Sequence, residues 1–163
     1  MVPAVDAILD DLRAELPTGA TVLDPAHISF GYPWLSPRRA RDVIDDVAAA
    51  LSNEPPFDVQ LRGPRRFSPD SKGRTTVWLD PQPAAALRSL SSTIARASGH
   101  DLVDFTPHCS LVRVGPGVDP RPLEDIVQPH LPLVTRLERV DFHVRENGCW
   151  HVERTMTLGT DHQ

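Results

Sequence analysis

The chain has few cysteines, no excess of positive charge and no long apolar run. Its two cysteines, Cys109 and Cys149, are too few for a disulfide framework, so both are expected to be free thiols in a reducing compartment, the cytoplasm. The 17 Lys and Arg residues against 22 Asp and Glu give a formal net charge of -5. This balance excludes a general DNA- or RNA-coating protein, although it permits a protein that binds one nucleotide or one RNA end. No segment approaches the length of a membrane span, so no membrane partner is expected.

Metal ligands in a recognisable arrangement are also lacking. The spacing of Cys and His fits no zinc motif, and the chain offers no carboxylate-rich cage, so neither a metal nor another cofactor is expected. Of the 163 residues, 40% are apolar and 24% are charged, which is typical of a globular protein with a substantial core. We therefore expect a single domain over residues 1–163, built from two interlocked lobes.

Apolar periodicity divides the chain into alternating helices and strands. Ser36 as N-cap and Pro37 at the first helical position introduce the clearest apolar stripe, which predicts a helix over residues 36–51. Apolar residues at the same spacing predict further helices over residues 4–16 and 83–97, and a short one after Asp119 and Pro120. Alternating apolar residues predict strands over residues 22–32, 57–61, 75–79 and 103–114.

The C-terminal part of the chain predicts a β-hairpin around Glu146-Asn147-Gly148. A two-residue turn would place Val144 opposite His151 and leave Trp150 on the polar face. A three-residue loop would place Val144 opposite Trp150 and His143 opposite His151, which keeps one face apolar. We favour the second register for this reason.

Two short stretches resemble each other: Pro25-Ala26-His27-Ile28-Ser29-Phe30 and Pro107-His108-Cys109-Ser110-Leu111. In each, a serine follows a histidine two residues later within an expected strand, so the two side chains share one face. Imidazole can move a proton near neutral pH, and a hydroxyl can donate a hydrogen bond to a phosphate or acyl oxygen. The two pairs would act on one substrate, or they are ordinary exposed strand residues, because so short a pattern also arises by chance.

A locally basic loop, residues 62–74, lies between the second and third expected strands. It carries only one acidic residue, Asp70, against five basic residues: Arg62, Arg65, Arg66, Lys72 and Arg74. This loop is either an anion-facing segment or a solvated hairpin tip.

Four further side chains are candidates for contact with a substrate. Tyr32 could stack on a base, although alternation places it on the core face. Arg113 could pair with a phosphate. Alternation along the expected strand, however, places its side chain on the same face as Cys109, unless the strand is irregular. His143 and His151 are either exposed hairpin residues or part of the same cleft as the motif histidines.

The two His-x-Ser stretches resemble the paired His-x-[Thr/Ser] signatures of the 2H phosphoesterases, in particular the bacterial 2′-5′ RNA ligase-like proteins with 2′,3′-cyclic phosphodiesterase activity. The resemblance covers most of the chain, including Pro56-Phe57-Asp58-Val59, Thr76-Val77-Trp78-Leu79 and the terminal hairpin. The chain departs from the family pattern in its short N-terminal strand and in having Ser where Thr is commoner. The resemblance implies an α+β fold of two pseudo-symmetric lobes, with two mainly antiparallel sheets facing a central cleft and helices on the outside.

The resemblance also implies a metal-independent phosphodiesterase, a monomer, that hydrolyses a 2′,3′-cyclic phosphate or a 2′-5′-linked nucleotide or RNA end. With one histidine on each wall of the cleft, His27 and His108 would be general acid and base, while Ser29 and Ser110 would bind the phosphate. The family implies that His27 protonates the 3′ leaving oxygen and His108 activates water, but the residues alone do not assign these roles. The alternatives are a non-catalytic nucleotide or RNA-end binding module of the same fold and an interaction domain with coincidental motifs.

Overall fold

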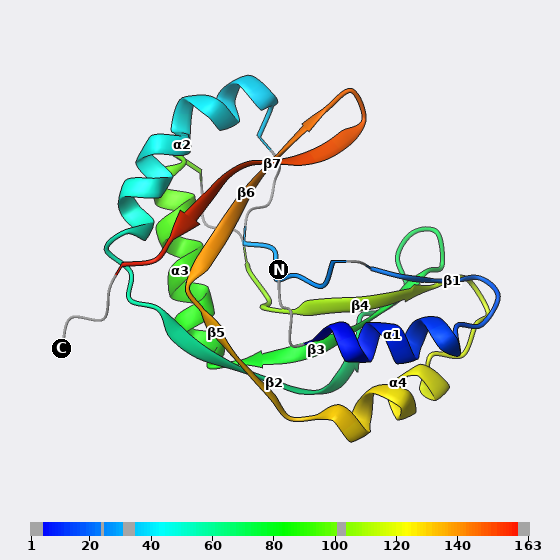
Figure 1. Ribbon diagram of the computed structural model, residues 1–163. Helices are drawn as coiled ribbons and strands as arrows, with labels where there is room; N and C mark the ends of the chain where they lie inside the picture. The colour runs from blue at the N-terminus through cyan, green and yellow to red at the C-terminus, as the bar shows by residue number, and fades with distance from the viewer. Residues whose placement is uncertain (1–4, 24, 31–34, 101–103, 160–163) are drawn as a thin grey trace. The chain divides into compact units, whose positions relative to one another are not determined.

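The computed structural model describes residues 5–23, 25–30, 35–100 and 104–159 and has a mixed α+β fold (Figure 1). The chain forms two compact units, each assembled from three separate segments. Unit 1 consists of Met1–Ser29, Val59–Pro83 and Pro107–Thr135, and unit 2 consists of Phe30–Asp58, Ala84–Thr106 and Arg136–Gln163. The expected α+β class and two-lobed organisation are therefore confirmed.

A five-stranded sheet, most of which belongs to unit 1, has the strand order β1-β4-β3-β2-β5. Strand β4 pairs antiparallel with β1 on one side and with β3 on the other, and β3 pairs antiparallel with β2. In this spatial order the strands are β1 (Ala20–Val22), β4 (Cys109–Val114), β3 (Thr75–Gln82), β2 (Phe57–Arg66) and β5 (Leu133–Leu137).

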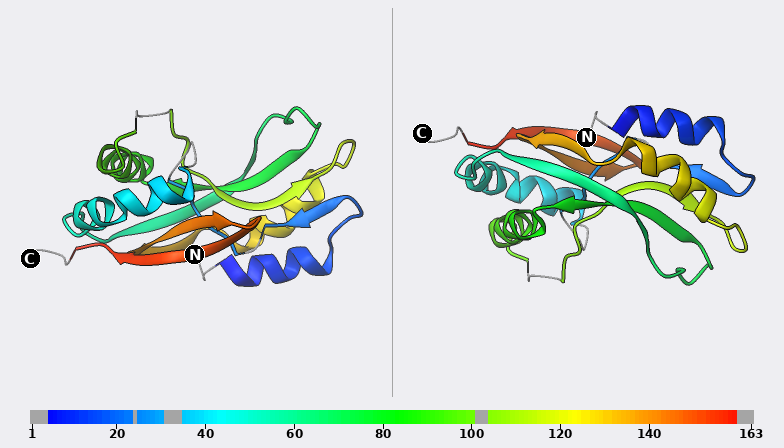
Figure 2. Two further views of the ribbon diagram at one scale, coloured as in Figure 1. Left: turned by 90° about the horizontal axis from the view of Figure 1, so that it is seen from above. Right: turned by 90° about the horizontal axis from the view of Figure 1, so that it is seen from below.

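One face of this sheet contributes to the core of unit 1. On β3, Val77 and Leu79 are fully buried, whereas Thr76 and Asp80 on the other face remain partly exposed. Helices α1 (Asp6–Ala14) and α4 (Arg121–Val127) lie next to each other, as both views of Figure 2 show, and a 3-10 helix, η2 (Gln128–His130), follows α4. These two helices add five buried side chains to the unit: Ile8, Leu9, Leu12, Leu123 and Val127.

Unit 2 contains two helices and the hairpin of β6 (Arg139–Glu146) and β7 (Cys149–Thr157). Helix α2 (Pro37–Leu51) begins as predicted, because the Ser36 hydroxyl accepts a hydrogen bond from the Arg39 amide at 3.3 Å. Helix α3 (Ala84–Ala97) also agrees with its predicted range. The core of the unit is one cluster of buried residues from α2, α3, β7 and the segment after it: Val43, Val47, Leu51, Leu90, Met156 and Leu158.

The predicted register of the terminal hairpin is wrong. Val144 lies opposite His151 and Arg145 lies opposite Trp150, so the turn has only two residues. Both turn residues, Asn147 and Gly148, have positive φ values of 51° and 83°. This backbone is typical of a type I′ turn, whose twist matches that of the two strands. The conformational preference of the Asn147-Gly148 turn therefore determines the register, although this register leaves Trp150 exposed.

The strands that carry the two motifs are shorter than predicted. Strand β1 ends at Val22, and the first motif then contributes one isolated bridge at Ile28; the second motif strand, β4, begins only at Cys109. The predicted strand at 75–79 is confirmed and extends to Gln82 in β3, and β2 runs on to Arg66 through residues expected to be a loop. Strand β5 has no counterpart among the predicted elements.

No helix in the described part of the chain is both long and apolar enough to cross a membrane.

Candidate active site

The two histidine motifs lie next to each other in unit 1. Ile28 of the first motif forms an antiparallel bridge with Cys109 of the second. In antiparallel pairing, this bridge places His27 across from Ser110 and Ser29 across from His108, all four on the same face. His27 and His108 are then diagonal neighbours, for which a separation of about 7–8 Å is typical.

This arrangement corrects the expectation of one histidine on each wall of a cleft. Both motifs belong to unit 1, and their segments are neighbours rather than parts of two facing sheets. The expectation failed because alternation along a strand shows which side chains share a face but does not show which strands are neighbours. The face that His27, Ser29, His108 and Ser110 share is called the motif face below.

The His27 ring is oriented by a local contact with its own backbone. Its Nδ1 lies 2.8 Å from the carbonyl oxygen of Pro25. Because a carbonyl oxygen can only accept a hydrogen bond, Nδ1 must carry a proton and donate it. The side chain is exposed, and Nε2 is the ring atom that remains to accept or deliver a proton.

Two aromatic rings lie against the imidazole of His108. The Phe67 ring is edge to face with it at a centroid distance of 4.9 Å, and the Trp78 ring is edge to face with it at 6.0 Å. The Phe67 and Trp78 rings stack on each other at 5.1 Å. His108 is partly buried as a result, and this packing restricts the orientation of its ring.

Trp78 was missed as a site residue, although its strand position contained a signal. It lies opposite Ser110 in the β3–β4 ladder and therefore belongs to the motif face. Its side chain is nevertheless 7% exposed, because the neighbouring rings cover it. The signal was its place in the predicted strand, where alternation puts its side chain on the opposite face from the buried Val77 and Leu79.

A β-bulge brings Arg113 onto the motif face. Trp78 pairs with Ser110 and Val77 pairs with Val112, so Leu111 has no partner on β3. Leu111 and Val112 are both fully buried, and the alternation resumes with Arg113 exposed. This bulge is the strand irregularity that Arg113 needed in order to share a face with the motif residues.

The cysteine between His108 and Ser110 does not take part in the chemistry of the motif face. Cys109 is fully buried, and burial raises the pKa of its thiol to about 12. A thiol with this pKa is neutral near pH 7, so it is neither a nucleophile nor a metal ligand. Both cysteines are free, and Cys149 is exposed.

The basic segment between β2 and β3 is not one cationic loop. Arg62, Arg65 and Arg66 lie on β2, and Arg65 and Arg66 pair with carboxylates of other elements, Asp80 at 3.0 Å and Glu124 at 3.4 Å. At the hairpin tip, Asp70 accepts hydrogen bonds from Arg74 and from the backbone, which lower the pKa of its carboxyl to about 2. Three of the five basic side chains, Arg65, Arg66 and Arg74, are therefore paired with carboxylates, which favours the solvated hairpin tip over the anion-facing segment.

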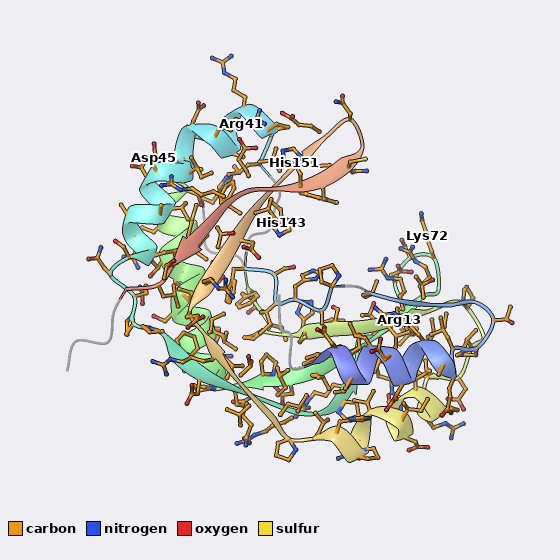
Figure 3. The ribbon with its side chains drawn as sticks, viewed as in Figure 1. Arg13, Arg41, Asp45, Lys72, His143 and His151 are labelled. Atoms are coloured by element: carbon orange, nitrogen blue, oxygen red, sulfur yellow. The ribbon has the colours of Figure 1, made fainter. Side chains whose placement is uncertain are left out.

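Three candidate side chains remain: Tyr32, His143 and His151. Tyr32 lies outside the described residues. His143 and His151 belong to the hairpin of unit 2, where they lie on different sides of the strands (Figure 3). His143 lies opposite Val152 rather than His151, and Nε2 of His151 lies 3.2 Å from a carboxylate oxygen of Glu153. Among the described residues, no three His, Cys, Asp or Glu side chains are grouped so that they could hold a metal ion.

A sequence model of the family described as the 2′-5′ RNA ligase superfamily matches residues 2–149 of the chain. The chain belongs to the 2′-5′ RNA ligase superfamily. This assignment agrees with the resemblance to the 2H phosphoesterases that the two motifs carry. No curated protein matches the chain.

Solved structures support the same fold. Those similar to this superfamily member include the protein TT0787 of Thermus thermophilus, at 18% identity with a TM-score of 0.68, over 99% of this chain and 96% of that one. E. coli LigT complexed with 3'-AMP matches at 15% identity with a TM-score of 0.67, over 96% and 92% of the two chains. A protein described as a phosphoesterase matches at 14% identity with a TM-score of 0.62, over 97% and 94%.

Proposed function

We propose that the chain is a phosphodiesterase that hydrolyses a 2′,3′-cyclic phosphate, or a 2′-5′-linked nucleotide or RNA end, by general acid-base catalysis with His27 and His108. The observation that carries the proposal is the bridge between Ile28 and Cys109, which sets two imidazoles and two hydroxyls on one face. Membership of the 2′-5′ RNA ligase superfamily supports it, as do the structural similarity to a protein described as a phosphoesterase and the 3'-AMP bound to the structurally similar LigT.

In the proposed reaction, a phosphate lies between the two imidazoles. His108 accepts a proton from water, the water oxygen forms a bond to phosphorus, and the bond from phosphorus to the 3′ oxygen breaks. His27 delivers a proton from Nε2 to the departing 3′ oxygen, which leaves a 2′-phosphate. The contact from His27 Nδ1 to the Pro25 carbonyl suits the acid role, because it directs the second ring nitrogen outward.

Two hydroxyls and one guanidinium would stabilise the charge that develops on the phosphate. Ser29 and Ser110 each lie across from a motif histidine and can donate to the non-bridging oxygens. Arg113 follows Ser110 on the same face and offers a planar set of donors to a phosphate. The reaction proposed here has no step that needs a metal ion.

Turnover of a nucleoside 2′,3′-cyclic phosphate by single variants tests the proposal. His27→Ala and His108→Ala are each expected to reduce turnover by roughly 10²- to 10⁴-fold with the fold retained. The matched control is His130→Ala, which removes another imidazole of unit 1 from outside the motif face. Unchanged turnover in either motif variant would refute the mechanism.

Two further outcomes separate the alternatives. Activity should persist in EDTA, whereas loss in EDTA and recovery with a divalent ion would indicate metal-dependent chemistry. Phosphate-competitive binding without turnover, across a panel of cyclic phosphates, would assign the chain as a binding module of the same fold.

A further inference from the structure

The motif face extends from β4 across β3 to β2, strands that lie side by side in the five-stranded sheet (Figure 1). Arg62 on β2 lies opposite Asp80 on β3, and Arg65 lies opposite Trp78. On a regular strand, two residues at this spacing project from opposite faces. Gly63 has no partner on β3, however, and this bulge gives both arginines the same face. Arg62 and Arg65 are therefore exposed on the motif face of unit 1.

Asp80 lies between His108 and Arg62 on this face. The last pair of the β3–β4 ladder joins Leu79 to Cys109. Antiparallel pairing makes Asp80 and His108, the next residues of the two segments, neighbours on the motif face. On its other side Asp80 pairs with Arg62. Because adjacent strands are about 4.8 Å apart, the backbones of His108 and Arg62 are separated by about 10 Å.

The carboxylate of Asp80 is held by two neighbours. Arg65 donates to its Oδ2 at 3.0 Å, and the Gln82 amide donates to its Oδ1 at 3.0 Å. The charge of Arg65 is therefore committed to this ion pair. The carboxylate also disfavours an anion directly above it, so a neutral part of a ligand, such as a sugar, suits the position between His108 and Arg62.

Arg62 is oriented for a ligand but is not paired with an acid. Its Nε donates to the side-chain oxygen of Gln60 at 2.9 Å, which restricts the orientation of the guanidinium. Within the part of the chain that the structure describes, its terminal nitrogens have no acceptor. A guanidinium offers a planar set of donors that matches the oxygens of a phosphate.

The motif face is positive, although the chain has a net charge of -5. Within unit 1, the strands of the sheet place four charged side chains on this face: Arg62, Arg65, Asp80 and Arg113. With both histidines neutral, the ion pair of Arg65 with Asp80 leaves the charges of Arg62 and Arg113. Arg113 lies on β4 and Arg62 lies two strands away, so these cations suit two anionic groups of one ligand.

We propose that Arg62 binds a second phosphate of the substrate. The identity of the first phosphate, between the motif histidines, rests on the proposed function, whereas the second position rests on the register and charge of β2. A 2′,3′-cyclic phosphate occupies the 2′ and 3′ oxygens of the ribose, so the 5′ oxygen is left to carry the second phosphate. The substrate class is then a nucleoside 2′,3′-cyclic phosphate with a 5′-phosphate, either terminal or joined to a preceding nucleotide.

Isothermal titration calorimetry with the proposed product and its 5′-phosphorylated form tests this inference without turnover. Adenosine 2′,5′-bisphosphate should bind the unaltered chain roughly tenfold more tightly than adenosine 2′-monophosphate at one ionic strength, the effect of one charge-assisted contact. Arg62→Gln should bring the two affinities together, through loss of affinity for the bisphosphate. Arg62→Lys should retain part of the preference, because the charge remains while the planar set of donors is lost.

The matched control is Lys72→Gln, which removes another cation of the same basic segment. Lys72 lies at the tip of the β2–β3 hairpin, away from the motif face (Figure 3), so this variant should keep the full preference for the bisphosphate. Circular dichroism and thermal unfolding establish that each variant folds. The inference is overturned if the unaltered chain binds the bisphosphate no more tightly than the monophosphate, or if Arg62→Gln keeps the preference.

Two further measurements define what the result means. The dinucleotide adenylyl-(3′-5′)-adenosine 2′-phosphate carries a linking phosphate in place of the terminal one. A loss of its affinity in Arg62→Gln assigns the position to either kind of phosphate, and an unchanged affinity assigns it to a terminal 5′-phosphate. Hydrolysis of adenosine 2′,3′-cyclic phosphate tests the proposed function separately, because its absence would leave the measured phosphate preference in place.

Discussion

Trp78 lies opposite Ser110 in the β3–β4 ladder, and its ring meets the imidazole of His108 edge to face at a centroid distance of 6.0 Å. The indole thus links Ser110, the proposed phosphate-binding residue of the second motif, to the orientation of the motif's histidine. Because Nε1 of Trp78 has no hydrogen-bond partner among the described residues, Trp78→Phe removes a ring edge but no hydrogen bond.

We expect Trp78→Leu to reduce kcat for a nucleoside 2′,3′-cyclic phosphate by about 10²-fold, because a small displacement of a catalytic group has effects of this size. KM should change little, since the side chain orients His108 and does not itself bind the substrate. Trp78→Phe should retain most of the activity, and steady-state kinetics with matched thermal unfolding distinguishes the two variants. Equal losses in both variants, or a change in KM alone, would contradict this role.

Arg113 reaches the motif face because the bulge at Leu111 reverses its parity. We expect Arg113→Gln to raise KM about tenfold, by loss of one charge-assisted contact to a phosphate. The increase should shrink at high salt, where such contacts are screened. Measurement of KM at two ionic strengths tests this, with Arg121→Gln as control, because Arg121 is exposed and pairs with Asp119. An unchanged KM in Arg113→Gln would exclude Arg113 from substrate binding.

The ion pairs of Arg41 with Glu146 and Glu153 predict a pH-dependent difference in stability. Hydrogen bonds from Arg41 lower the pKa of both carboxyls below the ordinary value of 4.5. A lowered pKa in the folded chain means that these pairs stabilise it fully above pH 4.5 and progressively less as the pH falls through the lowered values. Arg41→Gln should therefore unfold more readily than the unaltered chain at pH 7, and this difference should shrink below pH 4.5.

Carboxyl titration by NMR measures the cause directly. In Arg41→Gln, the pKa of Glu146 and of Glu153 should rise toward 4.5. In the matched variant Arg154→Gln, which breaks the exposed pair with Asp45, both should keep their lowered pKa. The same pKa for these two carboxyls with and without Arg41 would refute the assignment.

Local signals were sufficient to predict the helices and the central strands. Ser36 and Pro37 define the start of α2, and the apolar stripe from Ala40 to Leu51 defines its buried face. The motif residues were also found from sequence, because His27 and His108 are each followed by Ser at a spacing that places both on one face. These features depend on residues within one or two turns of each other.

The features that were missed depend on pairing between distant segments. The neighbouring positions of Ile28 and Cys109 are separated by 81 residues in the chain, and periodicity does not contain this information. The bulge at Leu111 was hidden because Leu111 and Val112 are both apolar and either could continue the alternation. Strand β5 was missed because its exposed Val134, 61% accessible, breaks the expected pattern of apolar residues inside and polar residues outside.

The site was incomplete for the same reason. Phe67 and Trp78 approach His108 only once β3 and β4 are paired, and their sequence positions alone suggest a loop aromatic and a strand residue. The sequence also left two hairpin registers open, one favoured by the backbone conformation of a two-residue turn and one favoured by placing Trp150 on the apolar face. The chain adopts the first.

The central claim is that His27 and His108 act on one phosphate from the same face of unit 1. A crystal structure with a nucleoside 2′-monophosphate, the proposed product, tests it most directly. We predict that oxygens of one phosphate lie within hydrogen-bonding distance, about 2.6–3.2 Å, of a ring nitrogen of each histidine. A phosphate that touches only one of the two imidazoles, or that binds away from both, would contradict the account.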